Sequence, residues 1–346
     1  MDTRLQMLTR WVRQFPGFEH CQAEPVSGDA SFRRYFRVWQ EAGQRIPHIV
    51  MDAPPEHEDC EPFVAIARHW HRKGVSVPGI LQTDLAQGFL LLEDFGDRLM
   101  LGQLKDHSAD ALYRAAMDEL LLIAGQPSPP DHPLPPYDAT LLEREMALFP
   151  DWLLERQLGM SLDNSDRALL DTTFAILRES ALAQPEVTVH RDYHSRNLLV
   201  RPDQQRPGVI DFQDAVTGPV TYDLVSLLKD CYIQWPEQRI CEWLEYYRKK
   251  SLEAGLHRAD PDTFRQWFEL MGMQRHLKAA GIFARLSIRD GKHGYLNDIP
   301  RTVQYLMVAS SRQPALRHFH EWLSETVMPR IEASIGKAPD RERSDS

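Results

Sequence analysis

The sequence predicts an α+β fold with a small β-rich lobe at the N-terminus and a large helical lobe after it. Two observations carry this prediction. Short runs rich in aromatic and β-branched residues gather in the first 95 residues, whereas long stretches with helical spacing of apolar residues fill the chain from residue 96 onward. We therefore expect an N-lobe at 1–95, a C-lobe at 96–335 and a flexible polar tail at 336–346, with a ligand cleft between the lobes.

The N-lobe is predicted to combine two helices with short strands. Apolar residues between Leu5 and Phe15 have helical spacing, and Pro16-Gly17 ends this first helix. A second apolar face at helical spacing predicts a helix at 63–70. Strands are predicted at 32–39, 48–52, 75–81 and 88–93.

The C-lobe is predicted to be mainly helical. Helical periods cover 109–123, 141–158, 166–183, 222–228, 237–255, 261–286 and 300–331. The Pro- and Ser-rich segment 125–136 is typical of a loop. Short apolar runs predict three strands, at 188–190, 197–200 and 208–211.

Composition excludes several classes of protein. The 346 residues carry a formal charge of −10, so the surface should on average repel nucleic acids and anionic membranes. No apolar run approaches the roughly 20 residues of a membrane helix, and the first residues lack the apolar region of a secretion signal. The four cysteines form no C-x-x-C pair, which is typical of reduced thiols. We expect a cytoplasmic protein without an obligate protein partner.

A polar loop between two apolar runs carries residues suited to phosphoryl transfer. That chemistry needs an acidic group that orients the acceptor hydroxyl, and oxygen ligands that hold Mg²⁺ on the nucleotide phosphates. Asp192 and Asn197 stand five residues apart, and a tight loop would turn both toward one point. Asp211 follows the apolar Val209-Ile210, as expected for a metal ligand at the end of a strand.

Each of these residues taken alone could be structural. Asp192 and Asn197 could cap turns, and Asp211 could cap a helix. The order His-Arg-Asp, four residues, Asn, and then Ile-Asp-Phe is hard to produce by chance, so together they favour catalysis. Asp223 is predicted to cap a helix or brace the loop, and His190 to hold the loop through hydrogen bonds.

The same segments resemble a known enzyme family. Residues 190–197 and Asp211-Phe212 are similar to the catalytic and metal-binding loops of protein kinases. The loop filling 193–196 and the later segment 218–224 look more like the aminoglycoside phosphotransferase and choline kinase branch. Within that branch, the chain most resembles the bacterial anomeric kinases of N-acetylmuramate and N-acetylglucosamine from cell-wall recycling. The segments that carry this resemblance are 27–35, 50–55, 91–97 and 190–197.

The resemblance runs from Val26 to about Ile331 and implies a two-lobed protein-kinase-like fold. It implies a kinase that uses ATP and Mg²⁺ to convert a small-molecule amino sugar to its 1-phosphate in peptidoglycan recycling. By this resemblance Asp192 would be the base facing the sugar hydroxyl, and Asn197 and Asp211 would hold Mg²⁺.

The resemblance also implies two nucleotide-binding segments. The first is a turn whose backbone N–H groups cover the phosphates, made of Ser27, Gly28, Asp29, Ala30, Ser31 and Phe32. The second is the connection between the lobes, with Glu93, Asp94 and Phe95 beside the adenine. A Ser-Gly-Asp turn is equally typical of an ordinary hairpin, and Glu93-Asp94 of a solvated acidic pair.

The chain departs from kinases of this fold on the third strand. The usual lysine that holds the phosphates is replaced by Met51. Either the backbone and Mg²⁺ alone hold the phosphates, or another cation replaces the lysine, for which Arg33, Arg34 and Arg37 are the candidates. We prefer Arg34, because strand alternation places it with Phe36 and other apolar residues on the face expected to look inward.

A second departure lies after the metal loop, where Gln213 replaces the glycine of Asp-Phe-Gly. The neighbouring Asp214 could reach the sugar or a second Mg²⁺, or cap the following turn. His194 and Arg196, within the catalytic loop, are further candidates to contact the acceptor. His190 and His194 also have zinc-protease spacing, but Arg191 stands where that motif requires glutamate.

Two alternatives stay open at this point. A kinase of the same branch could act on an aminoglycoside, a choline-like amine or another metabolite. The mixed charges of the predicted C-lobe helices suit a neutral or anionic sugar better than a cationic amine. A nucleotide-binding pseudokinase or scaffold is favoured only by Met51, and the intact Asp192, Asn197 and Asp211 oppose it.

Overall fold

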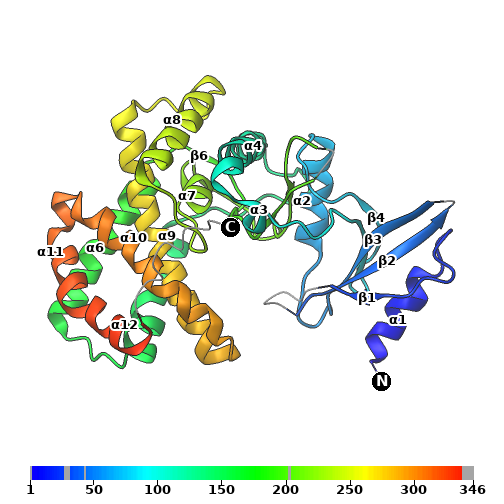
Figure 1. Ribbon diagram of the computed structural model, residues 1–346, viewed down its shortest axis with the longest axis horizontal. Helices are drawn as coiled ribbons and strands as arrows, with labels where there is room; N and C mark the ends of the chain where they lie inside the picture. The colour runs from blue at the N-terminus through cyan, green and yellow to red at the C-terminus, as the bar shows by residue number, and fades with distance from the viewer. Residues whose placement is uncertain (1, 27–31, 43, 202–203, 337–346) are drawn as a thin grey trace.

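The structure, a computed structural model, describes residues 2–26, 32–42, 44–201 and 204–336 and divides into a sheet-containing part and a helical part. Figure 1 shows these two parts at opposite ends of the molecule. The five-stranded sheet is antiparallel throughout, with strand order β1-β2-β3-β5-β4. Its strands are β1 Glu24–Pro25, β2 Arg34–Ala42, β3 Gln44–Asp52, β4 Ile80–Asp84 and β5 Phe89–Glu93.

Both faces of the sheet are covered because its strands direct alternate apolar residues to opposite sides. In β5, Phe89 and Leu91 pack with α1 (Thr3–Val12), whereas Leu90 and Leu92 belong to the main core with α2 (Glu61–Arg72). Helix α2 lies between the sheet and the helical part (Figure 1). The main core therefore continues from the sheet into the helical part.

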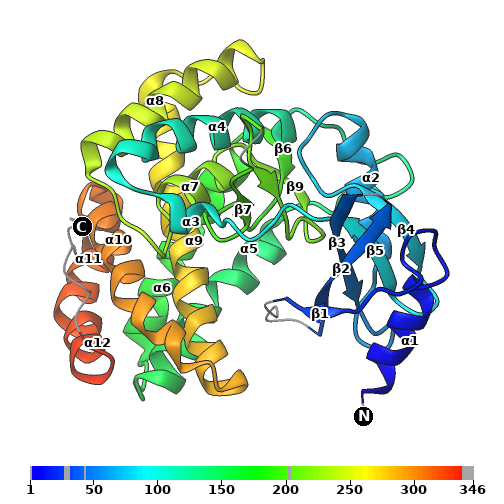
Figure 2. The same ribbon diagram turned by 45° about the vertical axis from the view of Figure 1, so that its right-hand side comes forward.

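The helical part is built around one long helix, α9 (Pro261–Asp290), which runs through its middle (Figure 2). The other helices and helical turns are α3 Met100–Gln103, α4 Asp106–Ala124, α5 Ala139–Met146, η1 Phe149–Gln157, α6 Asn164–Leu182, α7 Tyr222–Leu228, α8 Glu237–Glu253, η2 His293–Asp298, α10 Ile299–Ser311, η3 Pro314–Leu316, α11 Arg317–Trp322, η4 Leu323–Val327 and α12 Met328–Ser334. A helix buried on most sides should be apolar, yet α9 buries Gln274, Arg275, His276 and Lys278. These polar residues indicate a polar pocket inside the helical part.

Two small antiparallel sheets position the loops of interest. Strand β6 (Glu186–Val189) pairs with β9 (Val216–Pro219), and β7 (Leu198–Leu199) pairs with β8 (Gly208–Val209). The loop 190–197 connects β6 to β7, and the loop 210–215 connects β8 to β9. Because the strand pairs share these connections, the two loops are brought together at one end of the small sheets.

The α+β prediction is confirmed, and most predicted elements occur within a few residues of their expected bounds. Three predictions are wrong in detail. The segment 75–81 is mostly buried coil, with a strand only from Ile80. The helix predicted at 141–158 changes into η1 at Phe149, and the one predicted at 300–331 is interrupted before Pro314, because proline cannot continue a helix. The lobe boundaries stay predictions, and 337–346 lie outside the described residues.

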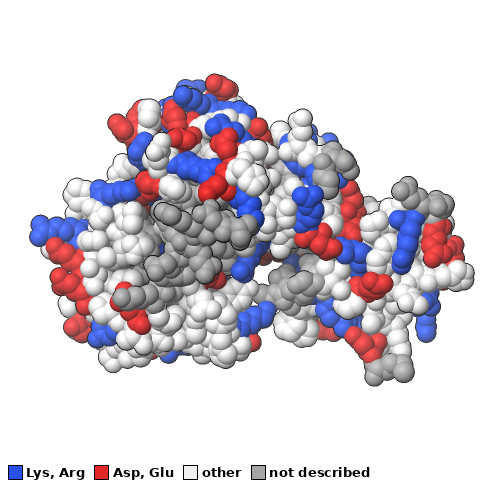
Figure 3. Space-filling model, viewed as in Figure 1, with Lys and Arg blue, Asp and Glu red and all other residues white. Residues whose placement is uncertain are grey.

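The surface carries charges of both signs. On the face shown in Figure 3, basic and acidic side chains are interspersed over both parts of the molecule. Within the described ranges, no helix combines the length and the apolar character needed to cross a bilayer.

Candidate active site

Two buried carboxylates hold the loop 190–197 in shape. Asp223, on α7, accepts hydrogen bonds from the backbone N–H of His190 at 2.6 Å and of Arg191 at 3.0 Å. Asp230 accepts from the backbone N–H of Ser195 at 3.0 Å and from its hydroxyl group. Of the two roles predicted for Asp223, the structure therefore shows the brace. Asp223 holds the loop before Asp192, and Asp230 holds it after Asp192.

The backbone is strained at two positions beside the polar residues of the site. Among the described residues other than glycine, only Arg191 and Asp211 have positive φ, at 78° and 66°. Side chains other than glycine rarely adopt this left-handed conformation, and it persists where surrounding contacts enforce it, often at functional sites. Arg191 directly precedes Asp192, and Asp211 is itself one of the two strained residues. The strained backbone therefore helps to set the directions of the Asp192 and Asp211 side chains.

Asp192 faces a small hollow in the helical part. This hollow of about 90 Å³ is also lined by His194, Arg275 and Lys278. Burial alone would raise the pKa of Asp192, but Lys278, His194 and Arg275 lower it to about 2. The Asp192 side chain is therefore a carboxylate at neutral pH, and no other described group donates a hydrogen bond to it.

Asn197 and Asp211 form a second polar cluster next to Asp192. The Asn197 amide donates hydrogen bonds to the backbone oxygen of Asp192 at 3.0 Å and to Oδ2 of Asp211 at 3.1 Å. Gln213, which replaces the expected glycine, donates to Oδ1 of Asp211 at 2.8 Å. An amide and a carboxylate that meet in this way supply oxygen ligands of the kind that Mg²⁺ prefers.

His190 joins the two loops, as predicted. One ring nitrogen, Nδ1, accepts from the backbone N–H of Asp192 at 3.2 Å, so Nε2 carries the proton that it donates to the Ile210 carbonyl at 3.0 Å. The bond at Nδ1 requires the neutral ring, because a protonated Nδ1 cannot accept. Burial lowers the pKa of His190 to about 4.

This histidine should make stability depend on pH. The unfolded chain takes up the proton near pH 6.5, whereas the folded protein does so only near pH 4, so the contribution present above pH 6.5 is lost as the pH falls. Between pH 8 and pH 5 the loss from His190 should be about 2 kcal/mol of unfolding free energy. Urea unfolding at pH 8 and at pH 5 would measure this loss. In His190→Gln the fall in unfolding free energy between these pH values should be about 2 kcal/mol smaller than in the wild type. Equal pH dependence in the two proteins would contradict this assignment.

A larger cleft opens between the sheet and the helical part. Its volume is about 580 Å³, and Asn197 and Asp211 lie on its wall. Glu93, Asp94 and Phe95 line it from the connection between the two parts. Asn197 links this cleft to the loop that carries Asp192, because its amide donates to the backbone oxygen of Asp192 and to Asp211.

The side chains of this connection are held by neighbouring arginines. Arg37 binds both carboxylate oxygens of Asp94, at 2.5 and 3.2 Å. Arg201, which follows β7, donates to Glu93 at 3.0 Å and lies 4.2 Å from the centre of the Phe95 ring. The Glu93 and Asp94 side chains are thus paired with arginines.

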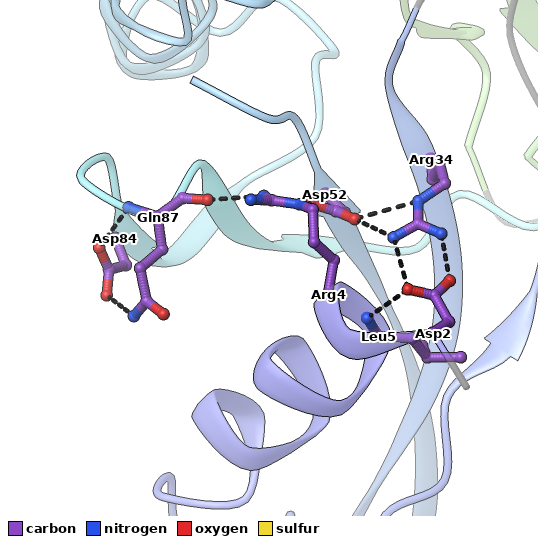
Figure 4. Close-up of polar contacts among 7 residues, drawn as sticks. All are labelled: Asp2, Arg4, Leu5, Arg34, Asp52, Asp84 and Gln87. Carbon is purple, nitrogen blue, oxygen red and sulfur yellow. Dashed lines mark hydrogen bonds and ion pairs between the residues drawn. The ribbon is translucent and has the colours of Figure 1, made fainter. Parts of the chain in front are cut away.

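Arg34 lies away from the cleft, contrary to our expectation. It shares a face with Phe36 as predicted, but that face packs against α1. Figure 4 shows the Arg34 guanidinium directed at Asp52 and Asp2. Asp52 is fully buried and also binds Arg4, at 2.9 Å to Nε. The expectation that this face looks toward the nucleotide is wrong, because the N-terminal helix covers it.

Arg33 is placed near the metal-binding loop instead. Its guanidinium binds Glu58 at 2.9 Å and is only 10% exposed. Burial opposes its charge, yet Tyr35, Glu58, Asp211 and Asp214 are close enough to raise the pKa of Arg33 above its ordinary value. Arg33 is therefore the cation of this segment that approaches Asp211.

The other predicted site residues lie in different places. Ser27 to Ser31 fall outside the described residues, and Phe32 is exposed and stacked on His57. His194 lines the hollow with Asp192, whereas Arg196 lines the large cleft and stacks on Tyr232 at 3.6 Å. Asp214, three residues after Asp211, is exposed.

Comparison with known proteins identifies the family. The model of the phosphotransferase enzyme family matches residues 22–266, most of the chain. This chain belongs to the phosphotransferase enzyme family. The N-acetylmuramate/N-acetylglucosamine kinase of Pseudomonas putida is 44% identical to it over 335 residues, 94% of this phosphotransferase and 97% of the relative. The kinase of the same name from Pseudomonas aeruginosa is 48% identical over 303 residues, 87% of each chain.

Solved structures show that this phosphotransferase has the predicted kinase-like fold. An ethanolamine kinase from Plasmodium vivax superposes with a TM-score of 0.64 at 11% identity, over 91% of this chain and 89% of that one. The choline kinase LicA from Streptococcus pneumoniae gives a TM-score of 0.60 at 13% identity, over 87% and 98%. At these identities the likeness concerns the fold alone.

Sequence reasoning missed several residues that complete the site of this phosphotransferase. Lys278 and Arg191 both bind Glu145, at 3.0 and 2.5 Å, and so fix the loop from α5 and α9. Arg275 lies one turn before Lys278 on α9. The signal in the sequence is two cations three residues apart in a predicted helix, but by itself this spacing predicts only mixed charges on the C-lobe helices.

Proposed function

We propose that this phosphotransferase transfers the γ-phosphoryl group of ATP to the anomeric hydroxyl of N-acetylmuramate and of N-acetylglucosamine, giving the sugar 1-phosphate. The observation that carries the proposal is the Asp192 carboxylate, which lines the small hollow beside Arg275 and Lys278, while Asn197, bonded to the Asp192 backbone, lines the large cleft. The names of relatives at 44% and 48% identity supply the sugars. Such an activity would serve the reuse of peptidoglycan sugars, and its need for ATP favours the cytoplasm.

The large cleft suits the nucleotide. Its volume of about 580 Å³ lies in the range of pockets that hold ligands of this size. Residues 93–95 would present backbone groups to the adenine, and apolar Ile49 and Leu92 would contact its ring. The phosphates would then point along the cleft toward Asp211.

Asn197 and Asp211 would hold Mg²⁺. The described residues contain no cluster of three or more His, Cys, Asp or Glu side chains suited to a metal. Two protein ligands fit Mg²⁺, since this ion usually keeps phosphate oxygens and water in its remaining positions. When bound, Mg²⁺ would neutralise charge on the phosphates.

The acceptor would enter the hollow on the other side of Asp192. The Asp192 carboxylate would accept a hydrogen bond from the sugar hydroxyl and orient its oxygen toward the γ-phosphorus. As the new oxygen–phosphorus bond forms and the bond to the ADP oxygen breaks, Asp192 would take the hydroxyl proton. The bracing of its loop by Asp223 and Asp230 holds the carboxylate in position for this transfer.

Arg33 and Arg34 form a matched pair of adjacent arginines for testing the phosphate grip. Arg33→Ala should raise the apparent KM for ATP by about tenfold or more, because a buried cation near Asp211 is lost. Arg34→Ala should leave this KM unchanged and lower stability by about 1 kcal/mol, since Arg34 is 39% exposed and Asp52 keeps Arg4. Steady-state kinetics and thermal unfolding of both variants would measure this. The opposite pattern would restore Arg34 as the phosphate cation.

The proposed function is tested by ADP release with a panel of acceptors. We expect turnover with N-acetylmuramate and N-acetylglucosamine that exceeds turnover with aminoglycosides and choline by at least about a hundredfold. Preference for a cationic amine would favour a different kinase of this branch. The absence of turnover with every acceptor, in a protein that still binds ATP, would favour a scaffold.

A further inference from the structure

The hollow beside Asp192 is lined by charged groups of both signs, two carboxylates and two cations. It is lined by Asp192, His194, Asp230, Cys231, Tyr232, Arg275, Lys278, Ala279, Ile282 and Phe283. Arg275 and Lys278 project into it from one face of α9, three residues apart. Both side chains are buried, with 6% and 8% of the residue exposed.

Most charged groups around the hollow have partners within the protein. Lys278 binds Glu145 at 3.0 Å and the Tyr222 hydroxyl at 3.0 Å. Asp230 accepts from the backbone N–H groups of Ser195 and Tyr232, each at 3.0 Å. These contacts leave Lys278 and Asp230 satisfied without a ligand.

Arg275 differs from its neighbours. Within the part of the chain that the structure describes, no acidic oxygen lies within the 4.0 Å ion-pair distance of its guanidinium, and its buried Nε has no hydrogen-bond partner. Asp192 and Asp230 are close enough to favour its charge but do not pair with it. The Tyr222 ring lies 5.9 Å from the guanidinium carbon, which is a cation–π contact and not an ion pair. A buried, permanently charged guanidinium without an ion pair is unfavourable, and native proteins rarely keep one without a use.

The position of Arg275 indicates which anion it would bind. The residues assigned to the phosphates and metal, Asn197 and Asp211, line the large cleft, whereas Arg275 lies with Asp192 and His194 in the acceptor hollow. Of the two proposed acceptors, N-acetylmuramate carries a carboxylate on its lactyl ether and N-acetylglucosamine carries none. A guanidinium binds a carboxylate through two parallel hydrogen bonds.

We propose that Arg275 binds the lactyl carboxylate of N-acetylmuramate and so determines how strongly the enzyme prefers the acidic sugar over the neutral one. This inference rests on the proposed function, because it assumes that both sugars are acceptors. Arg275 acts here as a specificity-determining residue, separate from the role of Asp192 in the reaction.

The test compares two sugars in two proteins. In Arg275→Gln, kcat/KM for N-acetylmuramate should fall at least about tenfold more than kcat/KM for N-acetylglucosamine, as expected for the loss of a charge-assisted contact. Arg275→Lys should show a smaller change in this ratio, because it keeps the charge without the two parallel bonds.

A second experiment changes the sugar instead of the protein, so its result for the wild type does not depend on the folding of a variant. The methyl ester of N-acetylmuramate should be a poorer substrate than the acid for the wild type, and esterification should cost Arg275→Gln little.

The outcomes separate the possibilities. Equal losses on the two sugars, with no effect of esterification on the wild type, would overturn the assignment of Arg275 while leaving the proposed function intact. In that case Arg275 would serve the transferred phosphoryl group or the structure of the hollow. Failure of the wild-type enzyme to phosphorylate either sugar would overturn the proposed function, and the assignment with it.

Discussion

Asp192→Asn is expected to lower kcat by at least about a hundredfold, which is the lower range for the loss of a positioned proton acceptor. The physical reason is that the amide no longer accepts the hydroxyl proton, although it retains the shape of the carboxylate. The loss should persist at high pH, because the pKa of Asp192, held to about 2 by Lys278, His194 and Arg275, already makes the wild-type group a carboxylate. Single-turnover measurements with saturating ATP and sugar would measure the chemical step.

Two controls make this result specific. The apparent affinity for ATP should change by less than about threefold, because Asp192 lines the acceptor hollow and not the large cleft. The variant should still unfold cooperatively with only a modest fall in melting temperature, since it loses the attraction to Lys278, His194 and Arg275 but no hydrogen bond from a described group. A variant that retains more than about a hundredth of the wild-type kcat would show that Asp192 is not the proton acceptor.

Asp211→Asn is expected to lower kcat/KM for ATP by about a thousandfold, as the loss of a charged metal ligand at the phosphates should remove several kcal/mol of stabilisation. The Mg²⁺ concentration that gives half-maximal rate should rise as well. This second readout is needed because Asp211 has a left-handed backbone, so the substitution could lower activity by changing the conformation of the loop instead of the metal ligand. Asparagine tolerates this conformation, so the fold should be kept.

The comparison variant for Asp211 is Gln213→Ala. It removes the hydrogen bond of 2.8 Å to the same carboxylate but leaves the ligand oxygen itself. We expect a change of less than about tenfold and a small shift in the Mg²⁺ dependence. If Asp211→Asn left the Mg²⁺ dependence unchanged, Asp211 would not be a metal ligand.

The polar centre of the site could be predicted from sequence because it is local. Asp192, Asn197 and Asp211 lie within two short loops between paired strands, so their spacing along the chain already encodes their proximity. His190 was predictable for the same reason, since both of its partners lie on these loops.

The wrong or missing predictions concern residues whose surroundings come from segments that are distant in the sequence. Alternation in β2 correctly grouped Arg34 with Phe36, but it could not tell that α1 would cover that face and supply Asp2 as a partner. Arg275 comes from α9, more than seventy residues after the catalytic loop, and its unpaired state is visible only once the helices are packed. Strand β9 was not predicted because Gly218 and Pro219 disfavour a strand, and this short segment forms one through its pairing with β6.

The product formed from ATP, Mg²⁺ and N-acetylmuramate tests the central claim most directly. Phosphorus NMR of the reaction mixture should show one new phosphate whose signal is coupled to the proton at C1 of the sugar, in amounts equal to the ADP released. The same experiment with Asp192→Asn should show no such signal over the same time. A phosphate attached at another carbon, or ADP released without any sugar phosphate, would contradict the account.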